Sequence, residues 1–178
     1  MRKVVAYELL SLDGVAEQPD EYITEFDEVM QENLGRIIAA QDTVVLGRRT
    51  YDDWAAFWPT SEIEPFASFI NGVQKFVVSS TPPEPLWENT GLVAGRPEDF
   101  VLELKQQSGR AIGIHGSISL IQSLLAAGVV DELQLVIAPA VHQRGRKLFD
   151  GGSAMRLSLI RGVVSPTGYL LLGYQVRS

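Results

Sequence analysis

The sequence contains no cysteine and only two histidines, His115 and His142. Without cysteine, the chain has no disulfide bond, no thiolate ligand for zinc or an iron–sulfur cluster, and no thiol nucleophile. Two histidines disfavour a histidine-rich metal centre, and the acidic residues do not follow the spacing of a calcium-binding loop. We therefore expect no metal site.

Long hydrophobic runs are also missing. Glu8 and Asp13 interrupt the apolar N-terminal segment before it reaches the length of a membrane span. The segment also lacks the small-residue cleavage site that is typical of a signal peptide. We expect a cytoplasmic protein that has no membrane partner.

Positive charge is scarce, since 15 Lys and Arg residues stand against 22 Asp and Glu residues, which gives a net charge of −7. This balance repels the phosphate backbone of nucleic acids and disfavours a nucleic-acid partner. The acidic excess lies in residues 1–89, which hold 16 acidic and 6 basic residues. Against this background, the adjacent Arg48 and Arg49 form a local site of positive charge.

With 178 residues, of which 46% are hydrophobic, the chain is long enough for one domain with an apolar core, and we expect a single domain over residues 1–178. Strand and helix patterns alternate along it. The predicted strands are Lys3–Leu10, Thr43–Leu46, Lys75–Ser79, Gly91–Ala94, Ala111–Ile114 and Asp131–Ala138, and the predicted helices are Glu21–Ala40, Arg48–Trp58, Ile63–Asn71, Pro97–Gln107 and the segment between Ser117 and Gly128.

The last forty residues have no helical periodicity. Two β-like runs, Met155–Val164 and Gly168–Val176, flank the turn residues Ser165-Pro166-Thr167 and predict an antiparallel hairpin. Together with the alternating elements, the hairpin predicts an α/β fold that has a mostly parallel central sheet flanked by helices.

The common catalytic signatures are absent, including the nucleophile elbow, the P-loop, the zinc-protease helix and the dinucleotide glycine fingerprint. What remains are three junctions at the carboxyl ends of predicted strands, Gly47–Thr50, Ser79–Thr81 and His115–Ser117. Ligands of open α/β sheets bind at this edge, and a helix N-terminus there favours an anionic group. Each junction taken alone has an ordinary structural interpretation: Arg48 and Arg49 as solvated residues of a first helical turn, Ser79 and Ser80 as a plain turn, and His115 as a core or turn histidine.

An ordered series of short motifs resembles the dihydrofolate-reductase-like superfamily, and most of all the stand-alone relatives of the reductase domain of the bifunctional riboflavin-biosynthesis deaminase-reductase. The motifs are Ser11-Leu12-Asp13-Gly14, Leu46-Gly47-Arg48-Arg49-Thr50-Tyr51, Lys75-Phe76-Val77-Val78-Ser79-Ser80, Ile114-His115-Gly116-Ser117, Val130-Asp131-Glu132-Leu133 and Gly145-Arg146-Lys147-Leu148-Phe149. The resemblance covers nearly the whole chain and implies the dihydrofolate-reductase-like fold and NADPH as the cofactor.

The resemblance also implies roles for particular residues on the cofactor side. Gly47, Arg48, Arg49 and Thr50 match the positions that hold the adenosine-side phosphates, and Ser79 and Ser80 match a hydroxyl pair near the 2′-phosphate and adenine. The turn of His115, Gly116, Ser117 and Ile118 matches the segment under the pyrophosphate and the nicotinamide ribose, with His115 in place of a usual glycine.

On the substrate side, the resemblance places Asp13 in the lining of the site. The first helix offers Asp27, Glu28 and Glu32 as acids, and no spacing selects one of them, so the catalytic residue is not assigned. Asp27 lies nearest to the boundary of the core. Trp54, together with Tyr51 and Trp58, is consistent with two roles: the side chains stack on a planar ring of a ligand, or they belong to the apolar core.

These features predict an NADPH-dependent reductase that transfers a hydride to a small molecule, either a planar pterin-like or pyrimidine-like heterocycle or a carbonyl compound. The family reading also predicts a homodimer. Two alternatives stay open: a catalytically silent NADP(H)-binding protein of the same fold, and an interaction protein whose hairpin pairs across a dimer.

Overall fold

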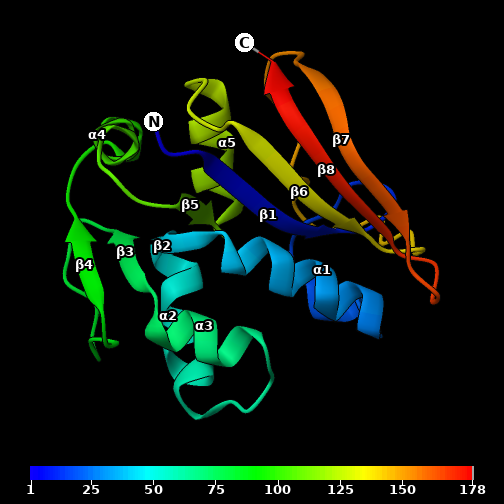
Figure 1. The fold of residues 1–178 in the computed structure, drawn as a ribbon, viewed down its shortest axis with the longest axis horizontal. Helices are drawn as coiled ribbons and strands as arrows, with labels where there is room; N and C mark the ends of the chain where they lie inside the picture. The colour runs from blue at the N-terminus through cyan, green and yellow to red at the C-terminus, as the bar shows by residue number, and fades with distance from the viewer. Residues whose placement is uncertain (178) are drawn as a thin grey trace.

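The structure, a computed structural model, describes residues 1–177; Ser178, which the predicted domain includes, lies outside the described residues. Its centre is an eight-stranded sheet in the order β4-β3-β2-β5-β1-β6-β8-β7 (Figure 1). The strands are β1 (Val4–Leu10), β2 (Gln41–Gly47), β3 (Gln74–Val78), β4 (Thr90–Val93), β5 (Ala111–Ile114), β6 (Glu132–Ile137), β7 (Arg156–Val164) and β8 (Leu170–Arg177). The first six are parallel, and the β7–β8 hairpin joins β6 antiparallel. The predicted fold class is confirmed.

Helices cover both faces of the sheet and create two apolar cores. α1 (Glu28–Ala39), α2 (Arg48–Phe57) and α3 (Phe66–Gly72) lie on one face, and α4 (Pro97–Gln106) and α5 (Ile118–Ala126) lie on the other (Figure 1). Met30 of α1 and Ile70 of α3 belong to the first core, whereas Ile121 and Leu124 of α5 belong to the second. Burial of apolar surface on both faces explains why the central parallel strands read as continuous hydrophobic runs.

The first helix begins later than the sequence pattern predicts. Residues Pro19–Glu21 form a short 3-10 turn, η1, and α1 starts only at Glu28, so the predicted helix Glu21–Ala40 is wrong at its N-terminal end. The Asp27 side chain accepts a hydrogen bond from the Met30 N–H and caps the helix. Ile23 and Phe26 have helical spacing in the sequence, yet they belong to an irregular segment that packs against the first core.

β7 forms one edge of the sheet and leaves apolar side chains on the surface. Leu159, Ile160 and Val164 are 60%, 55% and 68% exposed. An exposed apolar edge strand of this kind can pair with another chain, and the homodimer stays a prediction. Within residues 1–177, no helix combines the length and the apolar character that a membrane span requires.

Candidate active site

Two of the predicted junctions meet at the carboxyl edge of the sheet. The Gly47 N–H at the end of β2 donates a hydrogen bond of 3.2 Å to the Gly116 carbonyl, which follows β5. A Cβ atom at Gly47 would overlap the Ser117 hydroxyl and lie 2.9 Å from the Ser117 Cβ, and one at Gly116, where φ is +120°, would lie 3.0 Å from Thr50 Oγ1. These contacts leave no room for side chains at either glycine, and they bring Gly47, Thr50, Gly116 and Ser117 together.

The N-terminus of α2 has unpaired backbone donors at this edge. Its N-cap residue is Gly47, which provides no side-chain cap, and the first turn has no acidic residue. The first N–H groups of a helix lack partners within the helix and attract anions. By contrast, Ser117 caps α5 by accepting a hydrogen bond of 3.4 Å from the Leu120 N–H. The donor set at α2 therefore suits a phosphate group.

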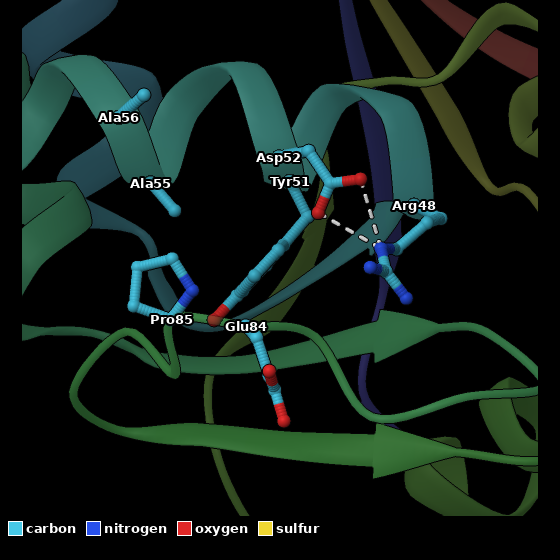
Figure 2. A pocket seen from close by; sticks show the side chains of 7 residues that line it. All are labelled: Arg48, Tyr51, Asp52, Ala55, Ala56, Glu84 and Pro85. Atoms are coloured by element: carbon cyan, nitrogen blue, oxygen red, sulfur yellow. Dashed lines mark hydrogen bonds and ion pairs between the residues drawn. The ribbon is translucent and has the colours of Figure 1, made fainter.

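Arg48 links this edge to the Ser79–Thr81 junction. Its Nε donates to both Asp52 carboxylate oxygens at 2.8 and 2.9 Å (Figure 2). Its Nη1 donates to Ser79 Oγ at 3.1 Å and to Thr81. A shallow cavity of about 200 Å³ lies beside it, between α2 and the segment that contains Glu84 and Pro85. Arg49 is exposed, and within residues 1–177 its side chain makes no hydrogen bond or ion pair. Ser80 is exposed as well.

A larger cavity of about 410 Å³ opens between β1, α1 and the α2–α3 region. This volume lies in the range of small-molecule sites. Most of its walls are apolar or aromatic, and carboxyl groups supply much of the rest. The lining residues are Tyr7, Glu8, Leu9, Pro19, Asp20, Ile23, Phe26, Gln31, Leu34, Trp54, Trp58, Ile63, Glu64, Phe66 and His115. We refer to this space as the aromatic cavity.

His115 connects the aromatic cavity to the cofactor edge. The ring lies among Tyr7, Trp54 and Phe66, with centroid separations of 5.6, 6.5 and 5.6 Å. Its Nε2 lies 2.7 Å from Gln41 Oε1, within hydrogen-bond distance. Burial lowers the pKa of His115 to about 4. At neutral pH the ring is uncharged and part of the cavity wall, one residue before the turn that contacts Gly47.

Glu8 is the acid that the sequence pattern did not single out. It lies on β1, where its neighbours Tyr7 and Leu9 also line the aromatic cavity. Burial raises the pKa of Glu8 to about 8, although a hydrogen bond from the Leu9 backbone N–H opposes this shift. A carboxyl group in an apolar wall keeps its proton at neutral pH, as acid–base catalysts do. The only signal in the sequence is a lone glutamate within an otherwise apolar strand.

Asp13 and Asp27, two of the three predicted substrate-side residues, do not line the aromatic cavity, whereas Trp54 does. The Asp13 carboxylate accepts hydrogen bonds from Ser11 Oγ and from the His142 and Gln143 N–H groups. The bonds from Ser11 and His142 hold the pKa of Asp13 well below its usual range. Asp13 therefore fastens the loop after β1 to the loop after β6.

Asp27 has a comparable role between α1 and the β7–β8 turn. In addition to capping α1, its carboxylate accepts a hydrogen bond of 2.6 Å from Thr167 Oγ1 in the β7–β8 turn. Burial would raise the pKa of Asp27, but the hydrogen bonds from Thr167 and Met30 lower it to about 2. Nearby, the Tyr169 hydroxyl accepts from the Thr24 N–H at 3.2 Å and the Glu25 N–H at 3.4 Å. The hairpin turn thus holds the segment that leads from the cavity wall into α1.

The protonated Glu8 predicts a pH dependence of stability. The unfolded chain ionises Glu8 near the ordinary value of 4.5, whereas the folded protein does so near 8. The folded state then binds more protons in this interval, so the free energy of unfolding should fall as the pH rises through it. Between pH 6.5 and 8, we expect Glu8 itself to contribute a loss of about 1.6 kcal/mol, which Lys75 opposes in part, because burial lowers its pKa to about 8 and its stability contribution rises with pH.

Urea unfolding at several pH values measures this slope. Glu8→Gln, which keeps the shape and removes the ionisation, should lack the fall in stability that Glu8 contributes above pH 6.5. Glu98→Gln provides the matched control, because Glu98 lies in the first turn of α4, outside the aromatic cavity. An unchanged slope in Glu8→Gln would show that Glu8 does not ionise in this interval.

Comparisons with known proteins show the family and the fold of the chain. The family model of the RibD C-terminal domain matches residues 2–171. The uncharacterized protein YyaP of Bacillus subtilis is 27% identical, with 97% of this chain and 94% of YyaP covered. A putative riboflavin biosynthesis protein of Shewanella sp. PV-4 has a similar structure, with a TM-score of 0.82, 19% identity and 99% of each chain covered.

Dihydrofolate reductase from Enterococcus faecalis, solved with NADP(H), shares the fold at a TM-score of 0.62 and 14% identity, over 99% of this chain and 97% of the reductase. The fold is therefore that of dihydrofolate reductase. The sheet order, the junctions at its carboxyl edge and the match over residues 2–171 lead to one conclusion: the chain belongs to the RibD C-terminal domain family.

Proposed function

We propose that the protein is an NADPH-dependent reductase that transfers a hydride to a small planar heterocycle or carbonyl compound. One observation carries the proposal: the turn of residues 115–117 belongs to both parts of the site. His115 lines the aromatic cavity, while Gly116 and Ser117 contact Gly47 and Thr50 beside the uncapped N-terminus of α2. A cofactor at the edge and a ring in the cavity would therefore lie next to each other.

The residues at the edge fit the chemistry of NADPH. The α2 N–H groups and Thr50 Oγ1 would bind its phosphates, and Arg49 is an exposed guanidinium in reach of solvent beside them. Arg48 holds Thr81 and also Ser79, one of the two serines that the family resemblance puts near the 2′-phosphate. When bound, NADPH supplies a hydride, and the protein supplies position and electrostatics.

In the aromatic cavity, the protein's own groups orient the acceptor and exclude water. Trp54, Trp58 and Phe66 form edge-to-face contacts, with centroids 4.8 to 6.1 Å apart, and give the wall a fixed shape for a planar ring. Glu8 holds a proton on its carboxyl group at neutral pH. A proton on the cavity wall is what the reduction of a C=N or C=O bond requires once a hydride arrives.

Titration of the full chain with NADPH tests the cofactor assignment. We expect saturable binding with a dissociation constant on the order of micromolar, the usual range for such enzymes. Loss of NADPH absorbance in the near ultraviolet, measured with pterin, pyrimidine and quinonoid compounds, tests the reaction. Tight NADPH binding without turnover of any of them would favour the silent binding protein. Absence of NADPH binding would favour the interaction protein and overturn the proposal.

A further inference from the structure

The aromatic cavity contains acidic groups and no cationic side chain. Glu8, Asp20 and Glu64 line it, whereas no lysine or arginine in residues 1–177 does. His115 adds no positive charge, because burial lowers its pKa to about 4. A ligand with a phosphate or carboxylate group would find no cationic partner in this cavity and would lie near the carboxyl groups of Asp20 and Glu64, so the cavity disfavours anions.

The three carboxyl groups differ in what they already bind. Glu64 accepts hydrogen bonds from the Ser68 hydroxyl at 2.5 Å and the Ser68 N–H at 3.2 Å. Asp20 is exposed at the η1 turn. Glu8 is partly buried, and within residues 1–177 its carboxyl group has no side-chain hydrogen bond or ion pair. Glu8 is therefore the carboxyl group of the inner wall that lacks a partner of opposite charge.

Aromatic rings surround the same space. Trp54, Trp58, Phe66 and Tyr7 line the cavity, and Trp54 and Phe66 meet at a centroid separation of 5.3 Å with an interplanar angle of 84°. Aromatic faces attract cations, most strongly where water is excluded, and they also stack on planar ligands. Rings combined with one unpaired carboxyl group are complementary to a flat, positively charged molecule.

We propose that the aromatic cavity binds a planar nitrogen heterocycle that is positively charged, or becomes so by taking a proton from Glu8, and that carries no phosphate or carboxylate group. The proposal rests on the reductase function in one respect, namely that this ligand is the hydride acceptor. It narrows the substrate from any planar heterocycle or carbonyl compound to cationic C=N compounds.

Hydride transfer from NADPH to such an acceptor balances in atoms and in electrons. The hydride from NADPH forms a C–H bond at the carbon of the C=N⁺ group, and the π electrons of that bond become the lone pair of the nitrogen. NADPH is oxidised to NADP⁺, and the acceptor becomes a neutral amine. The product then loses its attraction to the Glu8 carboxylate, which favours its release.

Affinity for a permanent cation should depend on pH in a defined direction. Glu8 is protonated in the free protein up to about pH 8, so binding of the cation must release that proton. We expect the affinity to rise by about tenfold per pH unit up to that value. The other titratable groups that face Glu8 or line the cavity are Tyr7, Tyr22, Asp20, Glu64 and His115. Burial raises the pKa of both tyrosines and lowers that of His115, so these three remain uncharged across this interval.

Isothermal titration calorimetry of the full chain, without NADPH, tests the proposal with three probes of similar shape. These are 1-methylquinolinium, a permanent cation; quinoline, which is neutral at pH 7.5; and quinoline-4-carboxylate, an anion. We expect the cation to bind at least about tenfold more tightly than quinoline, and the anion to bind least. Titrations of the cation in buffers of different ionisation enthalpy should show the release of one proton at pH 7.

Glu8→Gln should weaken binding of the cation by at least about tenfold and change quinoline affinity by less than about threefold. Glu98→Gln is the matched control, since Glu98 lies in the first turn of α4, outside the aromatic cavity, and it should leave both affinities nearly unchanged. Equal affinities for the cation and quinoline, tighter binding of the anion, or no binding of any probe at millimolar concentration would overturn the proposal. A parallel NADPH titration distinguishes this failure from a failure of the reductase function. The proton-release measurement on the unaltered protein decides the question if Glu8→Gln does not fold.

Discussion

Replacing Gly47 with alanine is expected to destabilise the protein by about 1–3 kcal/mol and to weaken NADPH binding by about 100-fold. The added methyl group would overlap the Ser117 hydroxyl and lie 2.9 Å from the Ser117 Cβ and 3.2 Å from its backbone nitrogen. Ser117 has a short side chain and caps α5, so it cannot move away without loss of that cap. The β2 and β5 junctions would separate at the place where we expect the phosphates to bind.

Chemical denaturation and NADPH titration measure the two effects of Gly47→Ala. The matched control is Gly35→Ala, because Gly35 lies inside α1 and its added Cβ would have only Pro65 within 4 Å, at 3.9 Å. Alanine stabilises a helix more than glycine does, so the free energy of unfolding of this control should rise by up to about 1 kcal/mol. The control should bind NADPH as the unaltered protein does. Unaltered stability in Gly47→Ala would show that the two junctions are not closely packed in solution.

The double replacement Arg48→Ala/Arg49→Ala is expected to weaken the binding of NADPH by about 100-fold and the binding of NADH by less than about fivefold. The two cofactors differ only in the 2′-phosphate, and two charge-assisted contacts to that group account for a difference of this size. The two arginines contribute differently. Arg48 fixes Ser79 and Thr81, whereas Arg49 is exposed with no side-chain partner in residues 1–177.

Single variants separate these contributions. Arg49→Ala should reduce NADPH affinity without changing stability, and the reduction should shrink at high salt because Arg49 is exposed. Arg96→Ala is the control for net charge, since Arg96 is also exposed but lies before α4 and pairs with Glu98 and Asp99. Equal losses of NADPH and NADH affinity in the double variant would overturn the assignment of Arg48 and Arg49 to the 2′-phosphate.

The order of the strands and helices was predictable because most of it follows local patterns. Apolar runs that end at Gly47 or at the Ser79-Ser80 pair mark buried parallel strands, and the run of β-like residues after Met155 marks the hairpin. The start of α1 was not predictable from periodicity. Ile23 and Phe26 repeat with helical spacing, but Asp27 caps the helix after them, and long-range bonds from Tyr169 hold the intervening backbone.

The part of the candidate site that consists of residues adjacent in the sequence was predictable. The part that the fold assembles from distant residues was not. Glycines and hydroxyl groups at strand ends pointed to the edge at which Gly47, Thr50 and Gly116 meet. Glu8 was not predictable as a site residue, because its role depends on burial among residues of other elements, which no local pattern reveals. The predicted acids belong to the first helix region, whereas Glu8, the partly buried acid of the aromatic cavity, lies on the first strand.

The bonds between the β7–β8 turn and residues 24–27 have a consequence for how the protein can change over evolution. Thr167 and Tyr169 bind Asp27, Thr24 and Glu25, and this segment continues directly from Ile23 and Phe26 in the cavity wall. Insertions or substitutions in a surface turn are tolerated more readily than changes inside a packed wall. Variation in the hairpin turn therefore offers a route to new substrate preferences that leaves every ligand-contacting residue unchanged.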